Sequence, residues 1–84
     1  MNLKLLYFAR LRETLGISRE VFTLDAPATV ADLLDHLRAR CGVWTTELAV
    51  ERNFRVAVNQ EMANASTALN DGDEVALFPP VTGG

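Results

Sequence analysis

The sequence predicts an α+β domain in which one main helix covers one face of a mixed β-sheet. Two β-type segments precede a strongly helical segment, and three further β-type segments follow it. The chain has 84 residues, which is enough for one small domain. Its 49% hydrophobic and 23% charged content is typical of a folded globular protein. We therefore expect a domain over residues 1–78 and a separate extended tail at residues 79–84.

The first β-type segment, residues 1–10, is apolar on both of its faces. Its alternating side chains are Leu3, Leu5 and Tyr7 on one face, and Leu6 and Phe8 on the other. Residues 11–17 contain Gly16 and are expected to form a turn before a second strand at residues 18–24. The short connection predicts that these two strands form an antiparallel hairpin.

The most regular segment is a helix that begins after Thr29, a favourable N-cap residue. Asp32 follows three positions later, as in a capping box. The apolar residues at helical spacing are Val30, Leu33, Leu34, Leu37 and Cys41. We expect Cys41 to be a small buried hydrophobic residue rather than a nucleophile, and Gly42 to end the helix.

Three β-type segments follow the helix: residues 54–59, a short strand within residues 60–68, and residues 74–78 after a turn at residues 70–73. Residues 43–53 are expected to form a short helical turn. A hairpin, a crossing helix and later strands describe the β-grasp, or ubiquitin-like, architecture. The apolar stripe of the helix should pack on Leu3, Leu5, Tyr7, Val56, Val58, Val75 and Leu77. Because one main helix covers only one face, the other face should stay bare. Its apolar residues would be Leu6, Phe8, Ala57, Ala76 and Phe78.

Composition excludes several classes of function. A single cysteine rules out an intramolecular disulfide framework, a four-cysteine metal site and an iron–sulfur ferredoxin. A net charge of −3 and a pI near 4.9 argue against nucleic-acid binding and favour a partner with a basic groove. No segment approaches the ~20 apolar residues of a membrane span, and the N-terminus lacks the features of a signal peptide. We expect a cytoplasmic chain that contacts other proteins rather than nucleic acid or membranes.

The C-terminal tail has the most distinctive chemistry in the chain. Its residues are Pro79, Pro80, Val81, Thr82, Gly83 and Gly84. The prolines cannot donate to a strand ladder, so they end the last strand and favour an extended exit. Six residues at ~3.3–3.6 Å each reach about 20 Å. Such a tail could thread a narrow channel and place its carboxylate in another protein's active site, whereas the alternative is a frayed end without function.

The rest of the sequence offers no competing catalytic chemistry. Its other glycines (Gly16, Gly42 and Gly72) are isolated, so the sequence has no phosphate-binding loop. A nucleotide that activated the terminal carboxylate would therefore be bound by a partner. The sequence also has only one histidine and one cysteine, too few for a typical metal site.

Three segments resemble the small-subunit family of molybdopterin synthase, the ubiquitin-like sulfur carriers of molybdenum-cofactor synthesis. They are residues 8–13 (FARLRE), 56–61 (VAVNQE) and 71–84 (DGDEVALFPPVTGG). The similarity spans most of the chain, and the C-terminal motif is its most specific part. Arg10 differs from the uncharged polar residue that many relatives carry there.

The resemblance implies that Gly84 is adenylated, becomes a thiocarboxylate and donates sulfur to cyclic pyranopterin monophosphate, forming the dithiolene of molybdopterin. It also implies three partners: the large synthase subunit, in a heterotetramer; an adenylyltransferase similar to ubiquitin-activating enzymes, which uses ATP and magnesium; and a sulfurtransferase. This chain would bind no cofactor or metal. It would be the sulfur-donor subunit of a transferase, with the acid–base groups on the large subunit.

We expect the bare sheet face beside the tail to bind these partners, because exposed apolar patches mark interaction sites. The partner-binding residues would be Leu6, Phe8, Arg12, Met62 and Phe78, with the phenylalanines as anchors and Arg12 as a charge at the rim. The alternative for the apolar members is that they pack on residues 43–53.

Other functions are compatible with the same tail. A carrier that donates sulfur to thiazole synthesis or to tRNA thiolation would use identical tail chemistry. A protein modifier would instead be attached to lysines through Gly84. A β-grasp binding module would not use Gly84 at all.

Overall fold

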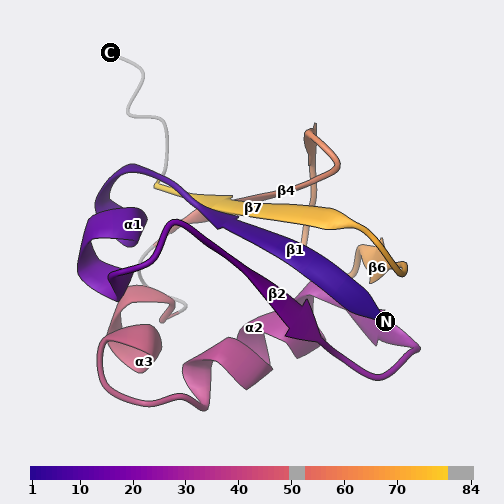
Figure 1. Ribbon diagram of the computed structural model, residues 1–84, viewed down its shortest axis with the longest axis horizontal. Helices are drawn as coiled ribbons and strands as arrows, with labels where there is room; N and C mark the ends of the chain where they lie inside the picture. Colours follow the sequence, from indigo (N-terminus) through magenta and orange to yellow (C-terminus); the bar gives the residue numbers. More distant parts are fainter. Residues whose placement is uncertain (50–52, 80–84) are drawn as a thin grey trace.

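The computed structural model describes residues 1–49 and 53–79 (Figure 1). Within them, the helices and strands are β1 (Asn2–Tyr7), α1 (Ala9–Leu15), β2 (Arg19–Thr23), β3 (Ala28–Thr29), α2 (Val30–Arg38), α3 (Val43–Glu47), β4 (Arg55–Val58), β5 (Glu61–Met62), β6 (Ala68–Leu69) and β7 (Glu74–Phe78). In this part of the chain, no helix is long and apolar enough to cross a membrane.

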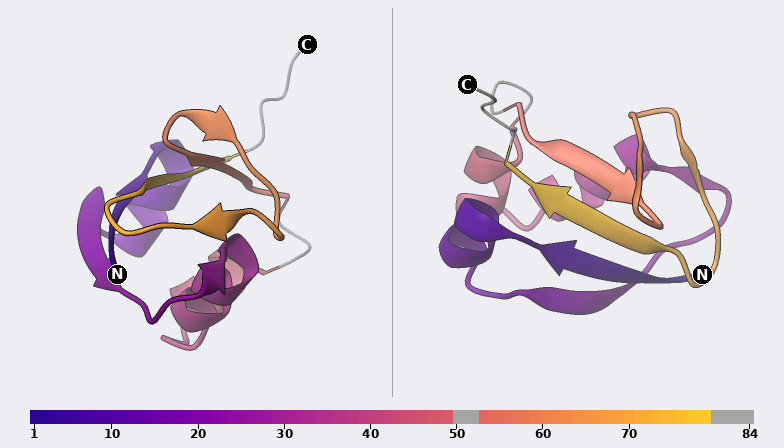
Figure 2. Two further views of the ribbon diagram at one scale, coloured as in Figure 1. Left: turned by 90° about the vertical axis from the view of Figure 1, so that its right-hand side faces the viewer. Right: turned by 90° about the horizontal axis from the view of Figure 1, so that it is seen from above.

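A five-stranded sheet with the order β2-β1-β7-β4-β5 organises the domain. β1 runs antiparallel to β2 and parallel to β7, and β4 runs antiparallel to both β7 and β5. The last strand of the sequence is therefore the central strand of the sheet. Helix α2 crosses beneath one face, as the sequence predicted, and the other face is free of helices (Figures 1 and 2).

The core lies between the sheet and α2. The apolar residues that were predicted to meet in it are buried: Leu3, Leu5, Tyr7, Val56, Val75 and Leu77 from the sheet, and Val30, Leu33, Leu34 and Leu37 from α2. Val58, also predicted there, is partly buried and packs against the same cluster. The predicted cap of α2 is confirmed, because the Thr29 N–H donates to the Asp32 carboxylate (2.9 Å) and the Asp32 N–H donates to the Thr29 hydroxyl (3.4 Å).

The segment between β1 and β2 is a helix, so the predicted turn at residues 11–17 is wrong. Leu11 and Leu15 lie one helical turn apart, and both are buried against the core. Their spacing supports a helix that a glycine-based turn prediction overlooks. Gly16 ends this helix in the left-handed region (φ 80°), where glycine is favourable.

Helix α2 ends earlier than the sequence predicted. The helix stops at Arg38, and Cys41 lies beyond it, exposed and at a φ of 67°. The prediction of a buried Cys41 is therefore wrong. Gly42 precedes α3 instead of ending α2, and its φ of 61° and ψ of −133° suit a residue without a side chain. The chain leaves the helical path after Arg38, and this allows Arg40 to contact the sheet.

Arg40 belongs to a polar cluster that joins the sheet to the helices. Its guanidinium donates two hydrogen bonds to the Glu20 carboxylate (2.9 and 2.7 Å) and lies 4.4 Å from the ring centroid of Trp44 on α3. The Tyr7 hydroxyl donates to the same carboxylate (2.7 Å). Burial, together with the hydrogen bond to Glu20, raises the pKa of Tyr7 far above its ordinary value, so the phenol remains a donor.

We expect Glu20→Gln to make the free energy of unfolding less dependent on pH in the acidic range. Burial raises the pKa of Glu20, but the hydrogen bonds from Arg40 and Tyr7 outweigh it, so the folded-state pKa lies below the ordinary value. The stability that this charge contributes is therefore present above the unfolded-state pKa and is lost as the pH falls through the folded-state pKa. Urea unfolding should give a deficit for the variant of about 2 kcal/mol at pH 7. The deficit should begin to shrink near the ordinary pKa of a glutamate, about 4.3, and should close as the pH falls through the lower folded-state pKa.

Glu13→Gln is the matched control, since Glu13 is exposed on α1. It should show no comparable deficit at pH 7. A Glu20→Gln deficit that persists unchanged at pH 3 would contradict the role of the Glu20 charge.

Candidate functional site

The tail begins at the end of the central strand, where it is held from both sides. The Phe8 N–H, just after β1, donates to the Leu77 carbonyl oxygen (3.1 Å), and Arg55 of β4 is the register partner of Phe78. Pro79 follows directly and is half-buried. We call Phe78 and Pro79 the tail root. Because its neighbours fix it on two sides, the root sets a defined starting point for the predicted tail.

The sheet face opposite α2, which we call the open face, carries a row of apolar residues. Strand register aligns them across four strands: Leu6 on β1, Ala76 on β7, Ala57 on β4 and Met62 on β5. With strands ~4.8 Å apart, this apolar row spans about 14 Å. Phe78 lies on the same face two residues along β7 from Ala76. Figure 2 (right) shows this face of the sheet without a covering helix.

The structure brings most of the predicted partner-binding residues to this face. Leu6 and Phe78 are half-buried, Met62 is 65% exposed, and Phe8 is 45% exposed at the end of β1. Arg12 is exposed on α1, which begins immediately after Phe8. The predicted tail residues Pro80, Val81, Thr82, Gly83 and Gly84 lie outside the described residues.

Ala57 differs from the prediction of a bare face, because it is buried. It lies in the apolar row between Ala76 and Met62. A single methyl group within a sheet is enclosed by the neighbouring strands, whereas the longer side chains beside it project further. The apolar row therefore presents Leu6 and Met62 at its two ends, with a shallow centre of alanines between them.

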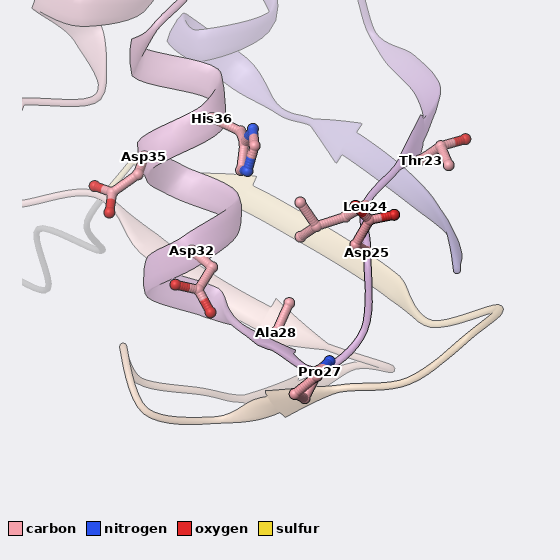
Figure 3. A pocket seen from close by; sticks show the side chains of 8 residues that line it. All are labelled: Thr23, Leu24, Asp25, Pro27, Ala28, Asp32, Asp35 and His36. Carbon is pink, nitrogen blue, oxygen red and sulfur yellow. The ribbon is translucent and has the colours of Figure 1, made fainter.

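A hollow of about 410 Å³ lies at the other end of the domain, between α2 and the segment that joins it to β2 (Figure 3). Its lining includes Asp25, Asp32, Asp35 and His36; His36 points from α2 toward Leu24, whereas Asp35 points away from that segment (Figure 3). Asp32 already caps α2. No group of His, Cys, Asp or Glu in residues 1–49 and 53–79 is arranged to hold a metal ion. The hollow adjoins Thr23, which pairs with the first residue of β1, so it lies far from the tail root.

Comparison with known proteins identifies the family. Residues 5–84 match the ThiS family. The chain belongs to the ThiS family. It is 42% identical to the molybdopterin synthase sulfur carrier subunit of Escherichia coli, with 98% of this chain and 99% of the relative covered. It is also 35% identical to the small archaeal modifier protein 3 of Haloferax volcanii over the full length of both. The predicted resemblance to the small-subunit family of molybdopterin synthase is confirmed.

The fold agrees with this assignment. The crystal structure of SAMP1 from Haloferax volcanii has a TM-score of 0.79 to this chain, at 32% identity and with all of both chains covered. The β-grasp prediction is thus confirmed. In this ThiS-family chain, the principal differences from the predicted arrangement are the helix α1 and the early end of α2.

Arg10, which differs from the predicted family pattern, joins two of the helices. Its Nε lies 3.3 Å from a carboxylate oxygen of Glu47, and the Thr14 hydroxyl donates to the same oxygen (3.4 Å). Glu47 is buried, with 8% of its surface exposed. This ion pair holds α1 against α3, so Arg10 has a structural partner within its own chain.

Ala9 holds the turn that presents Phe8. Its φ of 51° lies in the left-handed region, which costs residues with a side chain about 1–2 kcal/mol. The Phe8 carbonyl accepts from the Leu11 and Arg12 N–H groups (3.1 and 3.4 Å), so α1 starts at once and turns away from the sheet. Backbone strain of this kind concentrates at functional sites. The sequence carries no signal for it, because alanine is an ordinary helix residue.

Two arginines of the open face were also missed. Arg19 is the register partner of Leu6, and Arg55 that of Phe78. The alternation along residues 54–59 would have placed Arg55 on the face of Ala57. Arg19 needed the register of β2 against β1, which the sequence does not fix.

We expect Ala9→Gly to stabilise the domain and Gly16→Ala to destabilise it. Glycine at residue 9 removes about 1–2 kcal/mol of backbone strain, but the greater freedom of its unfolded chain costs about 0.4–1 kcal/mol. The free energy of unfolding should therefore rise by about 0.5–1 kcal/mol. An added Cβ at Gly16 meets nothing within 4 Å, so only its φ of 80° opposes alanine there. Urea unfolding of both variants measures the two changes. Changes of the same sign would contradict the left-handed conformation at one of the two residues.

Proposed function

We propose that this chain is the sulfur carrier subunit of molybdopterin synthase and that Gly84 carries the sulfur. The observation on which this depends is the motif at residues 71–84, which continues from the central strand into the Pro-Pro-Val-Thr-Gly-Gly tail. The 42% identity to a curated sulfur carrier subunit over 98% of the chain supports the same function. The fixed tail root provides a rigid base for a tail that works inside another protein.

The proposed chemistry starts from the terminal carboxylate, which is a poor electrophile. An adenylyltransferase that binds ATP and magnesium would join the carboxylate to AMP and release pyrophosphate. A persulfide on a sulfurtransferase would then attack the acyl carbon and displace AMP. Cleavage of the resulting S–S bond by a thiol leaves the thiocarboxylate on Gly84. Its polarisable sulfur is the nucleophile that would attack cyclic pyranopterin monophosphate, and two such transfers would complete the dithiolene.

The open face would dock on the large subunit while the tail enters its active site. Phe8, Met62 and Phe78 offer apolar surface beside the tail root, and the burial of such surface drives association. We expect a heterotetramer of two carriers and two large subunits. The large subunit would supply the acid–base groups of the transfer.

Protein modification is the second candidate function, favoured by the 35% identity to a small archaeal modifier protein. Lys4 is the only lysine of the chain, and its register partners Val21 and Glu74 place it on the open face. If copies were linked into chains from Gly84 to Lys4, the links would therefore cover the open face, which is the proposed docking surface. This placement favours a carrier, or a single-copy modifier, over a polymeric one.

Loading of the tail is tested by intact mass. After incubation with the activating enzyme, ATP, the sulfurtransferase and its sulfur source, we expect the chain to gain about 16 Da in its C-terminal peptide, because one oxygen is replaced by sulfur. A variant without Gly84 should not gain this mass. Conjugates of higher mass on other proteins that require Gly84 would support the modifier function instead.

Docking is tested by truncation of the apolar anchors. Phe8→Ala and Phe78→Ala should each weaken binding to the large subunit by about 10- to 100-fold, because buried aromatic anchors carry much of the energy of an interface. Titration calorimetry measures this change.

Val43→Ala is the matched control. Val43 is 49% exposed on α3, close to the 45% of Phe8, but lies away from the open face. Binding that is equally weakened by Val43→Ala, or unchanged in both phenylalanine variants, would remove the open face from the interface.

A further inference from the structure

The open face carries two arginines whose charges are not neutralised within the described part of the chain. Arg10, Arg38 and Arg40 each form an ion pair with a carboxylate, and all three lie on or next to helices. Arg19 and Arg55, in β2 and β4, form no ion pair with any residue in the ranges 1–49 and 53–79. Both are exposed. Arg12, exposed on α1 beside Phe8, likewise forms no ion pair with the described residues, so the unpaired arginines lie on the open face or next to it.

Register places each of these arginines beside an apolar residue of the docking surface. Arg19 lies opposite Leu6, and Arg55 lies opposite Phe78. Side chains directly opposed in antiparallel strands have Cβ atoms ~4.5–5.5 Å apart. The central strand β7 lies between the strands that carry the two arginines. The cations therefore border the apolar surface on opposite sides of the tail root.

The other charges of this face offset one another. Lys4 on β1 and Glu74 on β7 are register partners with opposite signs. The arginines at residues 19 and 55 are left to set the sign of the face. The whole chain has a net charge of −3, which by itself would indicate a basic partner. The local sign at the docking surface is the reverse.

We propose that the surface which binds this face is apolar at its centre and acidic at its rim, with carboxylates that pair with Arg19 and Arg55. The inference rests on the proposed function, since the occupant is the large subunit of molybdopterin synthase. A basic or uncharged rim would remove water from the two guanidinium groups without compensation. An acidic rim instead steers the encounter and fixes the orientation in which the tail root faces the large subunit.

The experiment compares charge variants in stopped-flow binding to the large subunit at 50 mM and 500 mM salt. At low salt, Arg19→Gln and Arg55→Gln should each weaken binding about three- to tenfold, chiefly through a slower association rate. The loss should shrink at high salt because the rim charges are screened. Glu74→Gln removes the acidic residue from the same face and should change the association rate in the opposite direction.

Ala65→Glu is the control for net charge. Like each Arg→Gln change, it lowers the net charge of the chain by one, but it lies in the exposed loop between β5 and β6, whose backbone contacts α2. It should bind much as the unmodified chain does. A loss for Ala65→Glu equal to those of the arginine variants would overturn the inference, because total charge would then explain them.

The results that would overturn an acidic rim on the partner differ from the result that would overturn the proposed function. If Arg19→Gln and Arg55→Gln bind normally at low salt while Phe8→Ala is weakened, the open face still docks but its partner has no acidic rim. If the arginine variants bind more tightly, the rim of the partner is basic and the inference is wrong. If Gly84 gains no sulfur, the proposed function fails whatever the arginine variants show.

Discussion

The position of β7 at the centre of the sheet is the constraint on which the rest of the structure depends. The strand that leads into the tail pairs with β1 on one side and β4 on the other. Near its end, the Leu77 carbonyl accepts a hydrogen bond from the Phe8 N–H. A tail attached to an edge strand could peel away with that strand, whereas a central strand is held by two ladders. A carrier needs this property, because its last residue must be placed by the docking of a folded domain far from it.

The face of the sheet toward α2 stabilises the fold, whereas the open face is left without a covering helix. The face toward α2 is closed by Leu and Val side chains, and the cluster of Tyr7, Glu20 and Arg40 ties that layer to the sheet. The open face needs none of these contacts for folding, so it is available for a partner. The strained Ala9 marks the junction between the two, since the chain turns there from the open face into the helical layer.

Local sequence patterns correctly predicted the features that depend only on residues close together in the sequence. The capping box at Thr29 and Asp32, the alternation of Leu3 with Leu5, and the proline that ends β7 each depend on a few neighbouring residues. The errors arose where distant contacts decide the conformation. Arg40 leaves the helical path and contacts Glu20, twenty residues earlier, and Cys41 follows it out of the helix. The arginines of the open face depend on strand register, which residues far apart in the sequence determine together.

Transfer of sulfur from the loaded carrier tests the central claim most directly. Thiocarboxylated chain, purified large subunit and cyclic pyranopterin monophosphate are combined, and the mass of the carrier and the amount of dithiolene are followed together. The account predicts that the carrier loses about 16 Da and that two carriers are discharged for each dithiolene formed. A carrier that stays loaded in this mixture, yet discharges to a thiazole precursor or a tRNA, would contradict it.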